Sequence, residues 1–219
     1  MSSQIWQSFL LENTMKKSTS QSKNPGLIYI FTGDGKGKTS AALGMLTRAL
    51  ANNWKVSWIS WYKEASWGVS EHALSTILNE KTQKNLTFLP MGKGFYLKNE
   101  KTDPKSQLKI VKANSAIILD NDSVEEHKQA AQQALQKAEE LLPQVQILFL
   151  DEICNAVDDG LLEVEAVLEL LRERSSTHIV LTGRNVHPKL KESADLVSEI
   201  KKIKHPFDNG KLAVKGLDF

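Results

Sequence analysis

The sequence contains little cysteine, no long hydrophobic run and no excess of charge of one sign. Its 219 residues include one cysteine, Cys154, which excludes an internal disulfide framework and fits a reducing compartment. No apolar stretch approaches the roughly 20 residues of a bilayer-spanning helix, and the N-terminus lacks the pattern of a secretory signal. The 28 basic and 26 acidic residues are balanced, so charge predicts neither nucleic-acid nor membrane-surface binding. We therefore expect a cytoplasmic protein with no nucleic-acid or membrane partner.

A glycine-rich loop follows the first apolar run of the chain. Residues 32–39 read Thr-Gly-Asp-Gly-Lys-Gly-Lys-Thr and come directly after the expected strand Leu27–Phe31. Glycines at this spacing let successive N–H groups point inward as an anion nest. Lys38 then reaches the outer phosphates and the Thr39 hydroxyl ligates magnesium, although Thr32 stands where the usual pattern has its first glycine. The residues expected to hold ATP here are Thr32, Gly33, Asp34, Gly35, Lys36, Gly37, Lys38, Thr39 and Ser40.

Expected strands and helices alternate along the chain, which predicts a parallel sheet with right-handed crossovers. The expected strands are Leu27–Phe31, Lys55–Trp61, Leu86–Pro90, Val145–Leu150, His178–Thr182, Leu196–Ile200 and Leu212–Val214. The expected helices are Ser40–Asn52, Val69–Asn79, Ser123–Leu142, Leu161–Arg172 and Val186–Ser193. With the phosphate loop, this order predicts an α/β protein of the P-loop NTPase (RecA-like) type, with three layers and a mainly parallel central sheet.

The chain divides into an arm and one domain. Residues 1–26 are polar and read as an N-terminal arm, which is either flexible or folds over the nucleotide or a partner subunit. Residues 27–219 form the expected P-loop domain. Within it, 98–121 reads as an insert that carries a small hairpin over Leu108–Val111 and Ala116–Leu119.

A second motif follows the apolar run Ile147–Leu150. Asp151 and Glu152 come at the point where a P-loop domain keeps the carboxylate that completes its magnesium site. Magnesium keeps several waters, so one or two carboxylates near the Thr39 hydroxyl suffice. Glu152 either orients a water for attack on the terminal phosphate, as in ATP hydrolysis, or binds metal; spacing leaves both roles open.

Further motifs follow the later strands, and in this order they resemble one family. The chain is similar to the ATP:corrinoid adenosyltransferases of bacterial cobalamin biosynthesis and salvage, from Gly26 to the C-terminus. The family's phosphate loop shares the threonine in place of the first glycine. The segments that carry the resemblance are Phe31–Ala42, Leu150–Ile153, Thr182–Arg184, Ala194–Glu199 and Lys204–Phe219, with its His-Pro-Phe-Asp-x-Gly core.

The resemblance implies transfer of the 5′-deoxyadenosyl group of ATP to the Co(I) of a reduced corrinoid, with triphosphate leaving whole. Co(I) is a strong nucleophile and requires no protein base. The protein must therefore bind ATP, stabilise the departing charge and align C5′ with cobalt. Lys38 is the expected catalytic lysine of the loop. The family also places the nucleotide in the reverse of the usual orientation, so that C5′ faces the corrinoid.

The resemblance also assigns residues outside the loop. The family displaces the lower cobalt ligand with aromatic residues, in a segment that resembles residues 91–97; Phe95 matches, whereas Leu97 stands where a tryptophan is expected. Phe95 and Leu97 are thus catalytic candidates. Lys63 and Glu71 are expected ligand contacts. Arg184, whose guanidinium suits phosphate oxygens, is expected to hold an anion.

The family implies partners as well: a homodimer and an electron-donating reductase. Two other functions stay open at this stage. Asp151 and Glu152 also fit a P-loop ATPase that hydrolyses ATP to ADP. The leucine at position 97 also fits a non-catalytic protein that binds nucleotide and corrinoid.

Overall fold

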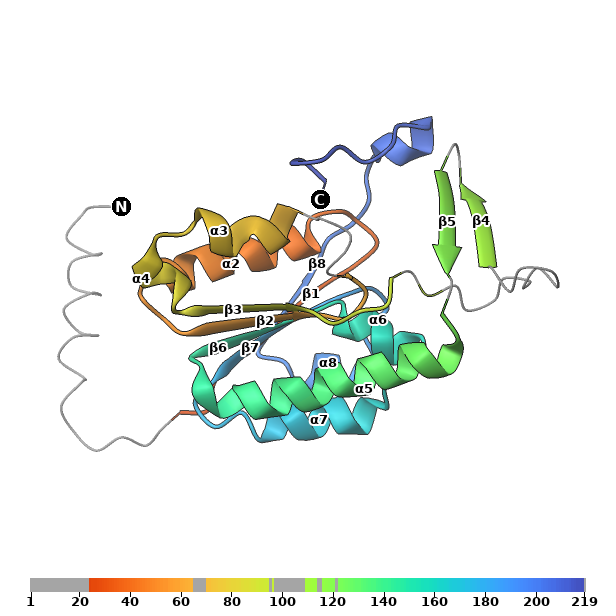
Figure 1. Cartoon of the computed structure of the whole chain (residues 1–219). Coiled ribbons are helices and arrows are strands. Elements are labelled where there is room, and N and C mark those ends of the chain that lie inside the picture. Colours follow the sequence, from red (N-terminus) through yellow and green to blue (C-terminus); the bar gives the residue numbers. More distant parts are fainter. Residues whose placement is uncertain are drawn as a thin grey trace, which may run out of the picture.

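A parallel sheet of six strands forms the centre of the molecule (Figure 1). The computed structural model describes residues 24–64, 70–94, 96, 109–113, 116–120 and 122–218. The strands in sheet order are β3 (Leu86–Pro90), β2 (Val56–Ser60), β6 (Ile147–Asp151), β7 (His178–Thr182), β1 (Ile28–Thr32) and β8 (Leu196–Glu199). Every pair of neighbours is parallel. The expected α/β fold class is confirmed.

Helices cover both faces of the sheet and give three layers (Figure 1). The longest helix of one face is α2 (Lys38–Ala51), next to the short α3 (Leu74–Ile77) and α4 (Glu80–Gln83). The opposite face carries α5 (Val124–Leu141), α6 (Ile153–Asp158), α7 (Val164–Arg172) and α8 (Pro188–Ser193). Single 3₁₀ turns occupy η2 (Ser70–Ala73), η3 (Leu142–Gln144) and η4 (Pro206–Asn209). No helix in the described part of the chain is long and apolar enough to cross a membrane.

The central strand β6 is apolar on both of its faces, and each face is covered by a layer of helices. All five of its residues are buried, as a continuous apolar run predicts for a strand inside a parallel sheet. On the α2 side, Phe149 stacks on Trp58 with the ring centroids 5.2 Å apart. On the other side, Leu148 and Leu150 pack in the cluster that holds the buried face of α5.

The helix expected over Ser123–Leu142 is confirmed, and so is its start signal. The Ser123 hydroxyl accepts a hydrogen bond from the Glu126 N–H at 3.2 Å, and the Glu126 carboxylate accepts one from the Ser123 N–H at 2.8 Å. This reciprocal capping box satisfies two backbone donors at the first turn. It fixes where α5 begins.

Two expected elements are wrong. The helix expected over Val69–Asn79 is broken at Leu78, whose backbone is extended, because Asn79 caps a new helix by accepting from the Thr82 N–H. Leu212–Val214 is not a strand. Its side chains are exposed, and glycines of positive φ at 210 and 216 turn the chain on both sides of it.

The expected hairpin is confirmed as β4 (Lys109–Ala113) and β5 (Ala116–Asp120), which pair antiparallel in a sheet of their own. Helix α6 was not expected from the sequence. Residues 1–23 of the expected arm and residues 98–108 of the expected insert lie outside the described residues.

The aromatic stack beneath α2 sets a stability prediction. Phe149→Ala should lower the free energy of unfolding by about 3–5 kcal/mol, because it removes a fully buried ring and leaves a cavity against Trp58. Val197→Ala, at a side chain 42% exposed on edge strand β8, should change it by less than about 0.5 kcal/mol. Urea denaturation of both variants measures the difference; equal effects would contradict the assignment of the core.

Candidate functional site

Polar residues from four strands meet at one edge of the sheet. The phosphate loop follows β1, and Ser60, Asp151 and Thr182 are the last residues of β2, β6 and β7. Parallel strands bring their carboxyl ends to the same edge, where open α/β sheets bind ligands. The fold therefore gathers motifs that are more than 100 residues apart in the sequence.

The phosphate loop bends tightly around the end of the sheet. Gly33 and Gly37 have φ of 106° and 119°, a region that favours glycine. A Cβ on Gly33 would lie 2.3 Å from the Ile200 carbonyl oxygen, so the segment after β8 leaves no room for a side chain. The Gly35 N–H donates to that same carbonyl at 2.8 Å. The loop is thus shaped by its glycines and braced by residue 200.

Lys38 closes the loop on itself. Its ammonium donates to the carbonyl oxygens of Gly33 and Gly35, both at 2.8 Å. Burial and the charge of Arg184 hold the pKa of Lys38 below its ordinary value. Among the described residues, the Lys38 ammonium is therefore held by carbonyl oxygens and forms no ion pair with a carboxylate.

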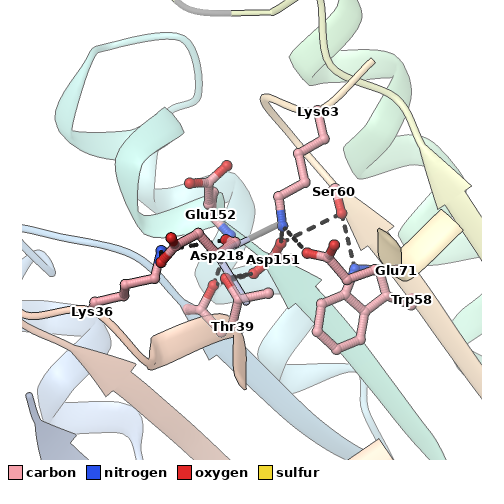
Figure 2. A network of polar contacts seen from close by, with 10 residues as sticks. Lys36, Thr39, Trp58, Ser60, Lys63, Glu71, Asp151, Glu152 and Asp218 are labelled. Carbon is pink, nitrogen blue, oxygen red and sulfur yellow. Dashed lines mark hydrogen bonds and ion pairs between the residues drawn. The ribbon is translucent and has the colours of Figure 1, made fainter. Parts of the chain in front are cut away.

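A buried carboxylate links the four chain segments of the site (Figure 2). Asp151 is fully buried, and its Oδ1 accepts from the hydroxyls of Thr39 at 3.0 Å and Thr182 at 2.7 Å. Its Oδ2 accepts from the Lys63 ammonium at 2.9 Å and from the Ser60 hydroxyl at 3.5 Å. Both oxygens are satisfied, as the burial of a charge requires.

Lys63 joins this carboxylate to a second one. Its ammonium lies between Asp151 and Glu71, with the Glu71 Oε1 at 3.1 Å (Figure 2). Burial alone would lower the pKa of Lys63, but the nearby charges of Asp151 and Glu152 raise it above its ordinary value. The other Glu71 oxygen, Oε2, is buried and has no hydrogen-bond partner among the described residues. This oxygen is available to a donor on a ligand.

Glu152 occupies a strained position beside the loop. Its φ is 65°, a left-handed conformation that is uncommon outside glycine, and it begins helix α6. The Asn155 side chain of α6 accepts from the Arg184 N–H at 2.6 Å, which fixes this helix against the turn after β7. Burial and the negative charge of Asp151 raise the pKa of Glu152 to about 7.

Two cavities adjoin at Thr39, Ser40, Glu152 and Asp218, which line both. The first has a volume of about 660 Å³ and follows the phosphate loop toward Arg184 and the C-terminal segment. The second has a volume of about 430 Å³ and lies beyond the Thr39 end of the loop. The remaining residues of this second cavity are Leu43, Thr47, Lys63, Ser70, Glu71, Leu74, Gly216 and Leu217.

The family model described as ATP:corrinoid adenosyltransferase BtuR/CobO/CobP matches residues 24–219. The chain belongs to this family. A corrinoid adenosyltransferase from Pseudomonas aeruginosa is 33% identical over 195 residues, which cover 89% of this chain and 84% of that protein. One from Escherichia coli K12 is 30% identical over 197 residues, covering 89% and 86%. The flagellar accessory protein FlaH from Methanocaldococcus jannaschii aligns at a TM-score of 0.49 and 14% identity, covering 82% of this chain and 78% of that one.

Most site residues predicted from the motifs and from the resemblance to the adenosyltransferases lie together. Asp34 to Ser40, Glu152 and Arg184 line the first cavity, and Lys63 and Glu71 line the second. Thr32 is buried at the end of β1, beneath the loop. The Asp34 carboxylate accepts from the Lys202 N–H at 3.0 Å and so faces the C-terminal segment. Phe95 and Leu97 lie outside the described residues.

Sequence reasoning missed several partners in this adenosyltransferase site. The hydroxyls of Ser60 and Thr182 bind Asp151, and Asp218 contacts the phosphate loop. Ser60 and Thr182 are each the last residue of an apolar strand, at the edge where open α/β sheets bind ligands. This position could have indicated that they belong to the site. Nothing local in the sequence indicates the contact of Asp218, because it lies 182 residues from its partner Lys36.

The close approach at Gly33 sets a binding prediction. Gly33→Ala should weaken ATP binding by at least about tenfold, because the methyl group collides with Ile200 and forces the loop open. Gly160→Ala is the matched control, since Gly160 also has positive φ but has open space around it. Calorimetric titration with ATP and magnesium measures both; wild-type affinity in Gly33→Ala would contradict the loop geometry.

The raised pKa of Glu152 predicts a pH dependence of stability. The folded protein holds a proton at Glu152 up to about pH 7, whereas an ordinary glutamate loses it near pH 4.5. Stability from this group is therefore present below about pH 4.5 and is lost as the pH rises through 7. Glu152→Gln removes that loss and should raise the free energy of unfolding by about 1–3 kcal/mol at about pH 8.

Denaturant titrations of Glu152→Gln at about pH 4.5 and about pH 8 measure this dependence. The gain should appear only at the higher pH. Exposed Glu139 on α5 provides the control, Glu139→Gln, which should show no such difference. An equal gain at both pH values would contradict a perturbed Glu152.

Proposed function

We propose that this protein transfers the 5′-deoxyadenosyl group of ATP to the Co(I) of a reduced corrinoid, and that triphosphate is released. The observation that carries the proposal is the cavity of about 430 Å³ beyond the Thr39 end of the phosphate loop. Family membership supports the choice of substrates.

The position of this cavity favours a reversed nucleotide. In an ordinary P-loop ATPase the terminal phosphate faces the metal-binding threonine and the acidic strand end, and only a water is needed beyond it. Here the space beyond Thr39, Asp151 and Glu152 has a volume typical of small-molecule sites. Its walls include the apolar side chains of Leu43 and Leu74, which suit a nucleoside. The adenosine would therefore lie on this side, with C5′ at the junction of the two cavities.

The chain's own residues supply binding and charge stabilisation. Co(I) attacks C5′ and forms the cobalt–carbon bond, while the C5′–O bond breaks and its electrons leave with the triphosphate. Loop N–H groups and the lysines at 36 and 38 are placed to stabilise this developing charge, which is electrostatic preorganisation. No water has to be activated, so Glu152 has no need to act as a base.

We further infer that magnesium accompanies the nucleotide. The Thr39 hydroxyl and the Asp151 Oδ1 lie 3.0 Å apart, and hard oxygen donors of this kind are what magnesium prefers. Glu152, which follows Asp151 in the sequence and lines both cavities together with Thr39, is the third candidate ligand. Bound magnesium would neutralise charge on the phosphates; the protein's part is to hold these oxygens in place.

Lys63 and Glu71 are proposed to face the adenosyl group, because both line the second cavity and Glu71 presents an unpartnered oxygen. Phe95 and Leu97 remain the proposed wedge that displaces the lower cobalt ligand. On the family's pattern we also propose a homodimer, an electron-donating reductase and a cytoplasmic location.

A β,γ-imido analogue of ATP separates this function from hydrolysis. The analogue resists cleavage between its β and γ phosphorus atoms but keeps the C5′–O bond intact. With magnesium and chemically reduced cobalamin under anaerobic conditions, it should still give a cobalt–carbon product, visible by absorbance. Lys38→Ala should lower kcat/KM for ATP by at least about 100-fold in the same assay.

Two outcomes would contradict the proposed function. One is orthophosphate release from ATP without any corrinoid, which indicates an ATPase. The other is binding of ATP and cobalamin with no alkylated product under strong reduction, which indicates a non-catalytic carrier.

A further inference from the structure

The segment after β8 is fastened along the phosphate loop. The Ile200 carbonyl accepts from the Gly35 N–H, and the Lys202 N–H donates to Asp34. In Figure 1 this segment rises from β8 over the carboxyl edge of the sheet and ends near the loop. The last described residues therefore form part of the wall of the phosphate cleft.

Asp218 contacts a lysine of the loop itself. The Lys36 ammonium lies 2.7 Å from the Asp218 Oδ1 and also donates to the Asp218 carbonyl oxygen at 3.3 Å (Figure 2). The Asp218 side chain is only 16% exposed, whereas that of Lys36 is 44% exposed. Lys36 and the backbone N–H of Val214 hold the pKa of Asp218 below its ordinary value. The ionised carboxylate of Asp218 is thus paired with Lys36, the lysine that the loop would otherwise present to phosphate.

A local turn fixes that carboxylate in place. The Val214 N–H donates to the Asp218 Oδ2 at 2.7 Å, and the Asp218 N–H donates to the Val214 carbonyl at 2.8 Å. These reciprocal bonds hold the side chain toward Lys36. Asp218 also lines both cavities, so it lies where phosphates and nucleoside would meet.

We propose that Asp218 is a positioning residue that competes with triphosphate for Lys36. When the cleft holds no phosphate, Lys36 forms its ion pair with Asp218. An entering triphosphate binds Lys36 in place of Asp218, and the 211–218 segment is released from the loop. When the product triphosphate is to leave, Asp218 recaptures Lys36 and so weakens retention of the product.

The competition follows from charge. A carboxylate held beside the loop repels the negative charges of a phosphate group, so the Lys36–Asp218 ion pair and a bound triphosphate oppose each other. Triphosphate carries several negative charges and therefore displaces Asp218 from Lys36. Its binding free energy is less favourable by the free energy of the ion pair that it breaks. The proposal rests on the proposed function only for the identity of the product, because binding of inorganic triphosphate needs no corrinoid.

Titration of the full chain with inorganic tripolyphosphate tests the competition. Asp218→Asn should bind this probe about two- to fivefold more tightly than wild type, the range expected for one partly exposed ion pair. The matched control is Glu140→Gln on α5, which removes the same charge from an ion pair of equal length, 2.7 Å, with a similarly exposed Lys137. It should bind as wild type does. Unchanged or weaker binding in Asp218→Asn overturns the proposal.

Two further readouts distinguish competition from a merely structural role of Asp218. With Lys36 replaced by glutamine, adding Asp218→Asn should change tripolyphosphate affinity less than it does in wild type; an equal change overturns the proposal. Hydrogen exchange over residues 211–218 should speed up when tripolyphosphate binds, while exchange over 33–39 slows. Slower exchange over 211–218 would show that the segment closes on the anion, and would also overturn it.

Discussion

The burial of one ionised carboxylate, that of Asp151, organises the site. A charge without water must be satisfied by its neighbours, and here donors arrive from the start of α2, the ends of β2 and β7 and the segment after β2. Two of these donors also line the cavities of the candidate site: Thr39 lines both, and Lys63 lines the second. The hydrogen bonds that stabilise the Asp151 carboxylate therefore also fix the positions of Thr39 and Lys63 beside the cavities.

The two cavities of the site differ in their lining, and on the proposed function they hold different parts of the nucleotide. A polyphosphate tail needs N–H groups and lysines, which line the first cavity, whereas a nucleoside needs apolar walls and a few acceptors, which line the second. The cations of the loop have partners within the protein: Lys38 contacts loop carbonyls and Lys36 contacts Asp218. On the proposed function, ligand binding is an exchange of these partners.

The sequence predicted those parts that depend on local pattern. The six strands of the main sheet, the capping box of α5 and the meeting of residues 32–39 with 151–152 at one edge of the sheet all follow from residue type and spacing. What the sequence could not predict depends on long-range contact. Helix α6 is held by the hydrogen bond from the Arg184 N–H to Asn155, 29 residues away in the sequence. The break at Leu78 is an exception, because it arises from a local cap in which Asn79 accepts from the Thr82 N–H, a signal that the pattern of apolar residues hid. The path of the C-terminal segment is set by the loop it covers, 182 residues away, and not by its own apolar run.

The orientation of the nucleotide is the central claim, and a crystal structure of the protein with ATP and magnesium tests it most directly. The account predicts the triphosphate in the loop at Lys38 and the adenosine in the cavity beside Glu71 and Leu74, with C5′ at the junction of the two cavities. Adenosine lying instead toward Arg184 and Phe207, with its terminal phosphate at Asp151 and Glu152, would contradict it.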